Sequence, residues 1–574
     1  MGINLSENAL TVAKSRYFLE NENWETCTRR VSEYIGNNES NKAEYINKFH
    51  ETIYNMDFIP GGRILRNAGR PRGSLFNCYV LSIGDSIEEI GQFNKDSLIL
   101  WSEGGGIGCN FSALRPRGSM ILGKGGKSSG LVSFLKASDG LARTIESGGQ
   151  RRAAALALVD ISHPEVVDFI DSKLERNELS HYNISVAINS DFLDAVESDS
   201  YWEFKFKQQS FGKMKARDIW DKILDNMIQC AEPGLLNWDK LIKNNSYYFD
   251  PIVATNPCGE VPLPAYGCCN LGALNLPNFI TGSVNTNWKK LESTISLAVR
   301  FLDNVTDVNK YTLKEVEIKA QNSRRIGLGI MGLAEYLFKK ELKYGSEKAC
   351  VEIERLMKFI RDHVYQELVK LSAEKGAFPR FDPILYTKAK FVNTLPVHLR
   401  LDIKKYGIRC VSGMAMAPTG TISLLADVTS GIEPLFSKSY IRKDKVGERI
   451  YIHHKYKEFL EQGYDIPDWF VDSHDLLPED HFETQVIIQH FTDGAVSKTI
   501  NFPSNTSKDV LDKLLLEYIK RLKGVTVYVD GSRDGQILNP MTNEEAIKHI
   551  QQSNSVSLSL DSSDVKCPSG SCSI

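Results

Sequence analysis

The sequence predicts an α/β fold, in which strands and helices alternate along the chain. Two observations support this prediction. From about residue 58, short apolar segments such as 75–81 are separated by glycines, which is typical of strands that alternate with helices. Near the C-terminus, strand-like residues 496–502 and 525–529 flank an amphipathic segment at 511–522, so this stretch predicts a βαβ unit.

Three regions follow one another along the chain. Residues 1–57 predict a small helical region, because apolar side chains such as Tyr17, Trp24 and Val31 recur at helical spacing between charged positions. Residues 58–540 predict one large α/β domain, and residues 541–574 predict a flexible tail. The last 22 residues contain nine serines and too little apolar area to repay the entropy of ordering them.

Three helices can be placed within the large domain. Their apolar faces run from Ile219 to Ile228, from Leu291 to Val305 and from Leu511 to Leu522. The third face repeats at spacings of three and four residues, and Gly524 is the expected stop after it. These helices support an α/β organisation over the whole length of the domain.

Composition excludes several classes of protein. The 574 residues carry a net charge of −3, which argues against a nucleic-acid surface or an acidic disordered chain. The 11 cysteines are too sparse for the framework of a small secreted domain. Because no signal peptide and no apolar run of 18 residues is present, the sequence predicts a cytoplasmic protein with no membrane partner.

Two common motifs are not supported by their surroundings. Residues 327–332 match the glycine pattern of dinucleotide-binding folds, but the segment before them, 319–325, is polar rather than strand-like. We interpret these glycines as sites of close helix packing. The histidines and cysteines show no metal-ligand spacing, so no metal site is predicted.

One pentapeptide brings three reactive groups together. Asn256, Cys258 and Glu260 alternate with Pro257 and Gly259, and in an extended strand or loop residues i, i+2 and i+4 share one face. By itself this pattern is more typical of a buried cysteine flanked by turn residues. The rest of the sequence decides between the two interpretations.

The chain resembles the catalytic subunit of ribonucleotide reductases, and specifically their adenosylcobalamin-dependent class II. Motifs in the family's order carry the resemblance over nearly the whole chain: LSENA at 5–9, GGRI at 61–64, FNC at 76–78, GGGIG at 104–108, NPCGE at 256–260, CNLG at 269–272, RRIGLG at 324–329, PTGTIS at 418–423, SKTIN at 497–501 and VYVDGSR at 527–533. Each motif is weak alone, but their order is specific.

The resemblance implies a ten-stranded α/β barrel with a radical cysteine on a central loop. Cys258, as a transient thiyl radical, would take the 3′ hydrogen of a ribonucleoside di- or triphosphate. Glu260 would be the general base for the 3′-hydroxyl, and Asn256 would orient the sugar hydroxyls.

The resemblance also implies two cysteine pairs. Cys78 and Cys269 would supply two electrons and end as a disulfide; Cys268 is an adjacent alternative, but the CNLG pattern begins at Cys269. Cys567 and Cys572 in the tail would carry reducing equivalents from a thioredoxin-like or glutaredoxin-like protein, because exchange needs an approaching thiolate.

Substrate contacts are implied in three segments. A glycine flanked by hydroxyl residues offers open backbone N–H groups to a phosphate, and glycine elsewhere lets the backbone approach the ligand closely. The matched residues are Asn77, Gly106, Pro257, Gly259, Pro418, Thr419, Gly420, Thr421, Ile422 and Ser423.

Adenosylcobalamin is the implied cofactor. Family members with a separate metal-containing subunit have two adjacent tyrosines in the last matched strand, whereas here Val529 follows Tyr528. Two alternatives remain open. One is a class I large subunit that needs a separate radical-generating subunit, and the other is a non-catalytic nucleotide-binding regulator on the same fold.

Regulation is implied by a region around residue 150. Asp139, Gln150, Arg151 and Arg152 resemble the family's specificity site, which would bind ATP or a deoxynucleoside triphosphate and which usually accompanies a homodimer. Because the family's core opens by Leu5, we expect no N-terminal ATP-binding cone.

Overall fold

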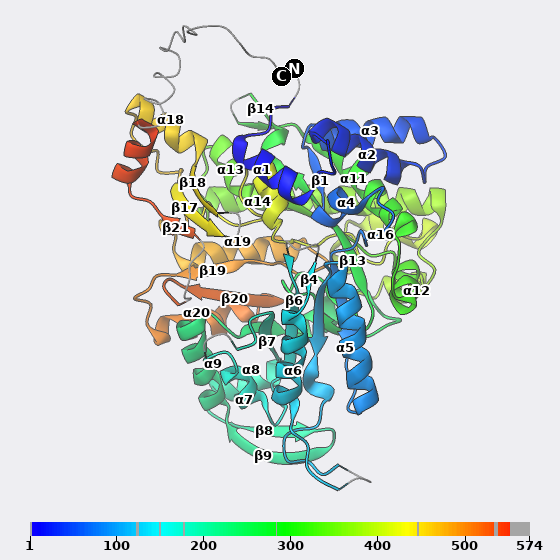
Figure 1. Ribbon diagram of the computed structural model, residues 1–574, viewed down its shortest axis with the longest axis vertical. Helices are drawn as coiled ribbons and strands as arrows, with labels where there is room; N and C mark the ends of the chain where they lie inside the picture. Colours follow the sequence, from blue (N-terminus) through cyan, green and yellow to red (C-terminus); the bar gives the residue numbers. More distant parts are fainter. Residues whose placement is uncertain are drawn as a thin grey trace, which may run out of the picture.

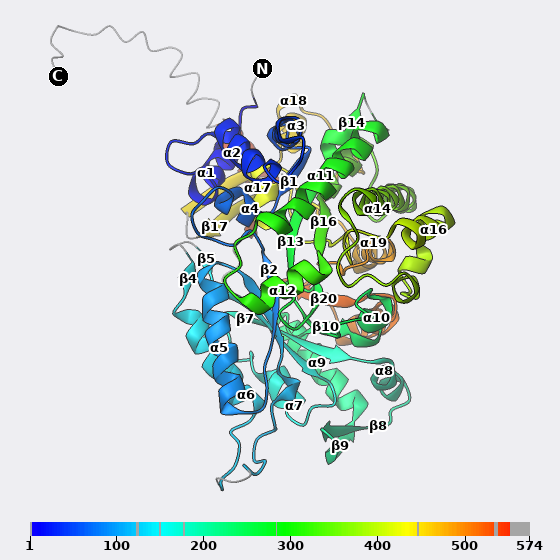
Figure 2. The ribbon, with the colours of Figure 1, turned by 90° about the vertical axis from the view of Figure 1, so that its right-hand side faces the viewer.

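The computed structural model describes residues 3–121, 125–147, 151–175, 178–282, 284–444, 447–532 and 538–551. Its centre is a ten-stranded sheet surrounded by helices. Figure 2 shows strands of this sheet in the middle, with α5 (Ile87–Ser102) and α6 (Leu131–Arg143) on one side and α14 (Glu347–Lys375) and α16 (Val397–Tyr406) on the other. The predicted α/β class is confirmed.

The sheet consists of two parallel halves. The first half contains β2 (Cys78–Ser82), β3 (Gly106–Asn110), β6 (Ala154–Asp160), β7 (Tyr182–Ile188) and β10 (Gly234–Asn237). The second contains β13 (Cys268–Asn275), β16 (Ile326–Met331), β19 (Thr499–Phe502) and β20 (Gly524–Val529). The halves meet in antiparallel pairs, β2 with β13 and β10 with β20.

An irregular segment joins β16 to β19 within the second half and so closes the whole sheet into a barrel. Residues 413–416 form parallel bridges on both sides, Leu328 to Met414 and Met416 to Val496. The chain then continues from Val496 into β19. Strand β1 (Phe58–Pro60) adds to β13 on the outside of this ring. The predicted barrel is therefore confirmed, with one strand position filled by single bridges.

Helices occupy the outside of the barrel and the N-terminal region (Figure 1). The N-terminal helices are α1 (Glu7–Arg16), α2 (Trp24–Gly36), α3 (Lys42–Tyr54) and α4 (Gly62–Asn67). The other helices are α7 (Val166–Asp171), α8 (Ser190–Glu197), α9 (Ala216–Cys230), α10 (Trp238–Asn244), α11 (Trp288–Val308), α12 (Lys314–Ser323), α13 (Leu333–Lys339), α15 (Pro383–Tyr386), α17 (Gly420–Leu425), α18 (His454–Gln462), α19 (Pro478–His490) and α20 (Lys508–Ile519).

Short strands form small sheets that are separate from the barrel sheet. They are β4 (Glu146–Ser147) with β5 (Arg151–Arg152), β8 (Tyr201–Phe206) with β9 (Gln209–Lys215), β11 (Ile252–Thr255) with β12 (Pro262–Pro264), β14 (Ile280–Thr281) with β15 (Asn285–Thr286), and β17 (Ser439–Asp444) with β18 (Gly447–Ile452) and β21 (Leu538–Pro540). Single 3₁₀ turns lie at Phe111–Ala113, Leu276–Phe279 and Val392–Thr394.

The three helices predicted from apolar periodicity are confirmed as α9, α11 and α20. Each buries its predicted face; in α20 the buried side chains include Leu511, Leu514 and Leu515. Strands β19 and β20 on either side of α20 are parallel neighbours, with Thr499 opposite Thr526, so the predicted βαβ unit is also confirmed. The N-terminal region is helical, as predicted; its boundary at residue 57 stays a prediction.

The interpretation of residues 327–332 as a helix-packing site is wrong. Residues 326–331 are the buried strand β16, which pairs with β13. A Cβ atom on Gly329 would lie 2.6 Å from the carbonyl oxygen of Ala415, and one on Gly327 would lie 2.6 Å from Leu271. These glycines therefore allow two strands and the bridging segment to pack closely inside the barrel.

The first residues of the predicted flexible tail are ordered. Residues 543–551 are helical, and Ala546 is completely buried with Phe459 and Phe470 in a small apolar cluster. Asn543 accepts a hydrogen bond from the hydroxyl of Tyr456. Enough apolar area is buried here to order the segment, so the prediction is wrong for residues 541–551. Cys567 and Cys572 lie outside the described residues.

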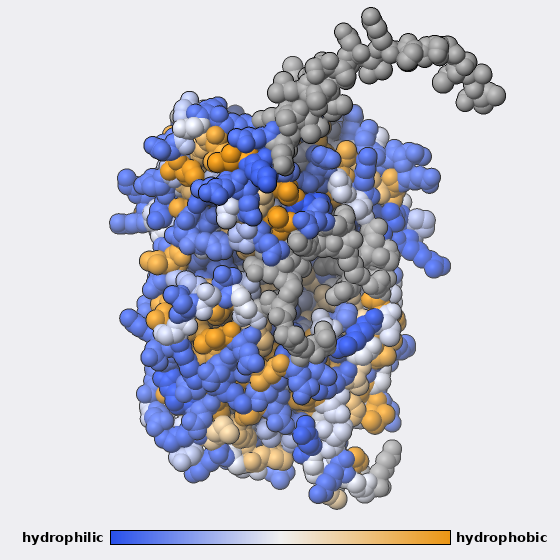
Figure 3. Space-filling model, turned by 60° about the vertical axis from the view of Figure 1, so that its left-hand side comes forward, coloured by the Kyte–Doolittle hydropathy of each residue, from blue (hydrophilic) through white to orange (hydrophobic). Residues whose placement is uncertain are grey.

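The face of the molecule in Figure 3 is mainly hydrophilic, with small separate groups of hydrophobic residues. Among the described residues, none of the helices combines the length and the apolar character that a membrane span requires.

The barrel interior is filled by the loop between β11 and β12, and Gly108 makes room for it. A Cβ atom on Gly108 would lie 1.6 Å from the carbonyl oxygen of Thr255. We expect Gly108→Ala to lower the free energy of unfolding by roughly 3 kcal/mol or more, because backbone atoms must move apart. Denaturant unfolding measures this loss.

Gly91→Ala in α5 is the matched control for that experiment. A Cβ atom on Gly91 would meet no atom within 4 Å, and alanine is favoured over glycine in a helix by about 1 kcal/mol. Equal stability of the Gly108→Ala protein and the unsubstituted protein would show that the loop does not pass as closely to β3 as described.

Candidate active site

Residues 256–261 thread the barrel between its two halves. On the side of the first half, a Cβ atom on Gly106 would lie 3.1 Å from the Pro257 ring. On the side of the second half, the backbone N–H of Ala495 donates to the carbonyl of Glu260 at 2.8 Å. The pentapeptide that the sequence singled out is thus held at the centre of the fold.

The loop is a turn rather than an extended strand. The N–H of Gly259 donates to the carbonyl of Asn256 at 3.0 Å, and the N–H of Val261 donates to the Asn256 side-chain oxygen at 2.9 Å. Gly259 has a φ of +84°, which side-chain-bearing residues rarely adopt. The extended alternative is wrong because the Asn256 side chain closes the turn; Cys258 is left exposed at its tip.

Glu260 is buried at the base of this turn. Its relative exposure is 1%, and its Oε2 atom has no hydrogen-bond partner. Burial raises the pKa of the carboxyl to about 7, although the Asn256 side chain and the Arg325 guanidinium favour the charged form. A carboxyl that titrates near neutral pH, beside an exposed thiol, has the properties of a general base.

Cys78 and Cys269 lie directly opposite each other on β2 and β13. Opposite residues on antiparallel strands have Cα separations within the range that a disulfide spans. The Asn256 side chain donates to the Cys78 sulfur at 3.3 Å, so the pair adjoins the turn. Burial raises the pKa of both thiols, that of Cys269 to about 12.

Cys268 belongs to a different environment. Successive residues of a strand point to opposite faces. Cys78 and Cys269 share the apolar cluster inside the barrel, whereas Cys268 packs into the outer core between strands and helices. The geometry therefore favours Cys269 as the partner of Cys78. Among the described cysteines none forms a disulfide.

The PTGTIS segment is a turn followed by α17. Thr419 has a φ of +55°, and its hydroxyl accepts a hydrogen bond from the N–H of Gly431 at 2.7 Å. Gly420 and Thr421 are exposed, whereas the side chains of Ile422 and Ser423 are buried. The groups that a ligand can reach here are therefore backbone N–H groups at the start of α17. The side chains of Ile422 and Ser423 are not accessible to a ligand.

Asn77 directly precedes the cysteine pair and carries an unused acceptor. Its Oδ1 atom is buried without a hydrogen-bond partner, and its carbonyl accepts from the N–H of Gly106 at 2.8 Å. Two residues that the sequence implied as substrate contacts thus lie together beside Cys78.

A cavity of about 1250 Å³ lies beside α17, at the end of the PTGTIS segment. Gly420, Thr526 and Tyr528 belong to its wall, as does Ser180 just before β7. On β7 itself, the Asn183 side chain donates to the carbonyl of Pro257 at 3.1 Å. The cavity and the tip of the central loop therefore lie near the same end of β7.

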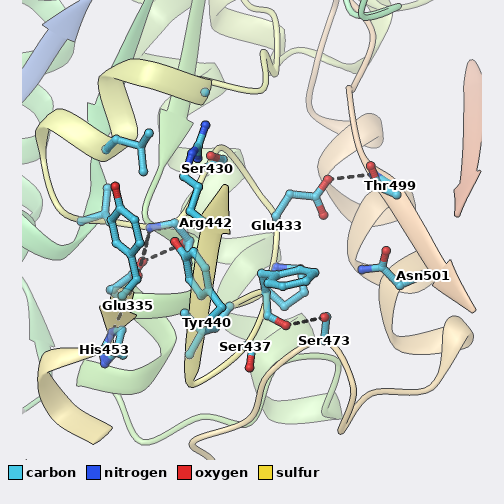
Figure 4. Close-up of a pocket in the computed structure, with 18 of the residues that line it drawn as sticks. Glu335, Ser430, Glu433, Ser437, Tyr440, Arg442, His453, Ser473, Thr499 and Asn501 are labelled. Atoms are coloured by element: carbon cyan, nitrogen blue, oxygen red, sulfur yellow. Dashed lines mark hydrogen bonds and ion pairs between the residues drawn. The ribbon is translucent and has the colours of Figure 1, made fainter. Parts of the chain in front are cut away.

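The sequence interpretation missed one wall of the cavity. It is formed by the hairpin of β17 and β18 and the residue after it, with Tyr440, Arg442 and His453 labelled in Figure 4. Tyr451 of β18 belongs to the same wall. The rings of Tyr440 and Tyr451 stack at 5.1 Å, and the Tyr451 hydroxyl and His453 Nε2 are buried without a hydrogen-bond partner. Alternating aromatic and charged residues were the only sequence signal.

On the opposite wall, the half-buried Glu433 pairs with the buried Lys498 behind it. Lys498, from the SKTIN motif, contacts Glu433 at 2.5 Å and His481 Nδ1 at 3.0 Å. The second Glu433 oxygen accepts from the N–H of Thr499 at 2.7 Å (Figure 4). This pair fixes the orientation of the cavity-lining Glu433.

The predicted effector residues are only partly described. The buried Asp139 carboxylate accepts from the N–H of His181 and pairs with Arg143, at 2.9 and 2.7 Å. Arg151 and Arg152 form β5, and Gln150 lies outside the described residues. Within the described ranges there is no cluster of residues suited to holding a metal ion.

Comparison with known proteins agrees with the architecture. Residues 76–528 match the family model described as ribonucleotide reductase, barrel domain, and residues 3–73 match that described as ribonucleotide reductase, all-alpha domain. These matches place the helical region and the barrel in the same order as the structure does.

Curated relatives extend the comparison to nearly the whole chain. A vitamin B12-dependent ribonucleoside-diphosphate reductase of Thermoplasma acidophilum is 33% identical over 94% of this chain and 73% of its own. One of the same name from Mycobacterium tuberculosis is 33% identical over 94% and 81%. A ribonucleoside-diphosphate reductase subunit alpha of Chlamydia trachomatis is 26% identical over 75% and 47%.

Proposed function

Because the chain belongs to the ribonucleotide reductase family and is a catalytic subunit that reduces ribonucleotides, we propose that it acts on diphosphates by a thiyl-radical mechanism at Cys258. The observation that carries the proposal is the convergence of Cys258, Glu260, Asn256 and the facing Cys78 at one turn inside the barrel. The names of the two B12-dependent relatives favour diphosphates and adenosylcobalamin.

The first steps use the residues of the turn. Cys258, exposed at the tip, takes the 3′ hydrogen atom of the ribose as a thiyl radical and later returns it. Glu260 accepts the proton of the 3′-hydroxyl, for which its unpartnered Oε2 is available. Asn256 orients the sugar, and its side chain holds the turn closed through Val261.

The reducing step uses the facing cysteines. The C2′–O bond breaks, the oxygen leaves as water, and a hydrogen takes its place at C2′. Cys78 and Cys269 together give up two hydrogens, that is two electrons and two protons, and one S–S bond forms between them. Their opposed positions on β2 and β13 allow this bond with little movement of the backbone.

Phosphate binding is proposed for the segment 418–423. The exposed N–H groups at Gly420 and Thr421 would receive the anion, while Tyr17 holds the Thr421 hydroxyl at 2.5 Å and so fixes the segment. Asn77, Gly106, Pro257 and Gly259 would line the sugar side of the substrate.

The cavity suits a large cofactor with many polar substituents. Its volume of about 1250 Å³, the stacked pair Tyr440 and Tyr451, and His453 Nε2, which makes no hydrogen bond and lies 3.9 Å from Glu335 Oε1, fit adenosylcobalamin, whose flat macrocycle is edged with amides. Tyr440, Arg442, Tyr451 and His453 would hold it. When bound, the cofactor supplies the one-electron chemistry that makes the thiyl radical.

Turnover by the isolated chain tests the proposal. Purified protein with adenosylcobalamin, a ribonucleoside diphosphate and a small dithiol should form the deoxyribonucleotide without a second subunit. Product that appears only with a separate metal-containing subunit would support the class I alternative. Nucleotide binding without product under either condition would support a non-catalytic regulator.

The tail cysteines are proposed as the carrier of reducing equivalents. Cys567 lies 16 residues beyond Gln551 along the chain, so the tail is long enough to carry a thiol away from the end of the described structure. We expect Cys567→Ser or Cys572→Ser to keep activity with a small dithiol but to lose at least about tenfold with a thioredoxin-like or glutaredoxin-like protein. Paired assays with the two reductants measure the difference, and equal losses in both would contradict the role.

Regulation and assembly are proposed on the resemblance. An ATP or deoxynucleoside triphosphate effector would bind near Asp139 and residues 150–152, in a homodimer. The division into a helical region at 1–57, a catalytic barrel at 58–540 and a redox tail within 541–574 belongs to the same proposal, as does a cytoplasmic location.

A further inference from the structure

Arg325 is a buried cation beside the cysteine pair. It directly precedes β16, and because Ile326 is opposite Asn270, Arg325 stands opposite Cys269 on the neighbouring strand. Its relative exposure is 3%. One of its nitrogens, Nη1, donates to the carbonyl of Pro262 at 3.1 Å, and its guanidinium lies 5.7 Å from the centre of the Tyr247 ring.

The guanidinium keeps unused donors inside the barrel. Among the described residues, Arg325 Nε and Nη2 make no hydrogen bond of standard geometry, and the side chains near enough to interact with the guanidinium include those of Cys269 and Tyr247. An arginine side chain stays charged at all relevant pH values, so unpaired donors of a buried guanidinium are costly. Such an arrangement suits a neighbour that becomes negatively charged only during part of the reaction cycle.

Other charged groups nearby already have partners. Asp493 accepts from the Tyr365 hydroxyl and from the N–H groups of Gly413 and Met414, at 2.7 to 3.0 Å. Lys523 donates to the carbonyls of Asp493 and Gly494. The groups that can still change charge beside Arg325 are therefore Glu260, Cys269, Tyr247 and Lys523. The guanidinium favours the charged form of the first three and disfavours that of Lys523, whose pKa burial lowers to about 7.

The two sulfurs of the pair differ in charge environment and in access. Cys269 has no exposed surface and faces Arg325, whereas Cys78 is 5% exposed and faces the Asn256 amide; the carboxyl of Glu260 is among the groups around both. In thiol–disulfide exchange the sulfur whose thiolate is better stabilised leaves faster, and the attacked sulfur must be accessible. Thiolate stabilisation favours Cys269 as the leaving sulfur, and accessibility favours Cys78 as the attacked sulfur.

We propose that Arg325 is a positioning residue that makes Cys269 the leaving sulfur and Cys78 the attacked sulfur when the oxidised pair is reduced. The inference rests on the proposed function of the pair. A thiolate of the tail or of a small dithiol bonds to Cys78, the S–S bond breaks, and its electron pair remains on Cys269 next to the guanidinium. A second thiolate then displaces Cys78 from the mixed disulfide, and both cysteines take up protons from water.

The test uses the full chain carrying Cys567→Ser and Cys572→Ser, so that only the buried pair exchanges. The pair is oxidised with diamide rather than by turnover, which keeps the test independent of catalysis. Dithiothreitol is then added, and the rate of disulfide loss is followed by alkylation and mass spectrometry from pH 6 to 9. Failure of a Cys78–Cys269 disulfide to form would count against the proposed function, not against the role of Arg325.

We expect Arg325→Met to slow reduction about tenfold or more and Arg325→Lys to recover part of the rate. The neighbour Arg324→Lys is the matched control, because Arg324 is equally buried but pairs with Asp303 and Asp307. Reduction that is as fast in Arg325→Met as in the unsubstituted protein would overturn the proposal.

A second measurement does not depend on the folding of any arginine variant. The diamide-oxidised protein with its native Arg325 is treated with a monothiol, such as glutathione, and quenched with acid, and the mixed disulfide is located by peptide mapping. We expect it at Cys78. A mixed disulfide found mainly at Cys269 would overturn the proposal.

Discussion

Replacing Cys258 with serine is expected to abolish deoxyribonucleotide formation and to leave nucleotide binding intact. An O–H bond is stronger than an S–H bond, so a serine cannot carry the radical that removes the 3′ hydrogen. The side chain is exposed at the tip of the turn, and the turn itself is closed by Asn256 and Gly259, so the substitution leaves the loop in place. A loss on the order of 10⁴-fold or more, the scale seen when a reacting residue is removed, is expected.

Cys350→Ser is the matched control for this loss. Cys350 is a half-buried thiol on α14, outside the barrel, and should be replaceable with little change in activity. Product formation and nucleotide affinity are measured on both variants. Deoxyribonucleotide above background from the Cys258→Ser protein would remove Cys258 from the radical role.

The sequence was informative wherever one segment is enough to define a feature. The face of α20 and the parallel neighbours β19 and β20 follow from local periodicity, and the central loop at residues 256–260, though not its turn, follows from a motif in a known order. Closure of the barrel through residues 413–416 could not be foreseen, because it depends on single bridges to strands far away in the sequence.

Features that depend on tertiary burial were missed for the same reason. The stretch before β16 is polar and gave no sign of burial, yet Arg325 is buried because the barrel encloses it beside Cys269 and Tyr247. The cavity wall at Tyr440 and Tyr451 has no motif of its own, and helical order after residue 542 depends on the burial of Ala546. In each case distant residues determine the environment.

Lowering the pH below about 7 is expected to remove activity through Glu260. Burial raises the pKa of this carboxyl to about 7, so the carboxylate that accepts the 3′-hydroxyl proton is present above that pH and is lost below it. The rate under limiting substrate should fall about tenfold for each further pH unit. Glu260→Gln should lose roughly 10² to 10⁴ in rate at neutral pH, and its residual activity should lack this acid limb.

Glu165→Gln is the control, since Glu165 is also a buried carboxyl with a raised pKa but accepts backbone N–H groups of Arg117 and Leu131 far along the chain from the turn. It should keep the acid limb. An acid limb that persists unchanged in Glu260→Gln would assign the titration to another group.

Ionisation of Glu260, which activity requires, is expected to lower the stability of the fold. A carboxyl whose pKa is raised on folding favours the folded state at low pH, and this contribution is lost as the pH rises from the unfolded value, near 4.5, to about 7. At pH 8 the ionised Glu260 therefore costs about 3 kcal/mol, and Glu260→Gln should be the more stable protein by up to that amount, with the gain disappearing near pH 4. Denaturant unfolding at the two pH values measures it. A residue whose removal destroys activity and raises stability is retained for chemistry rather than for packing, and equal stability of the two proteins at pH 8 would contradict that conclusion.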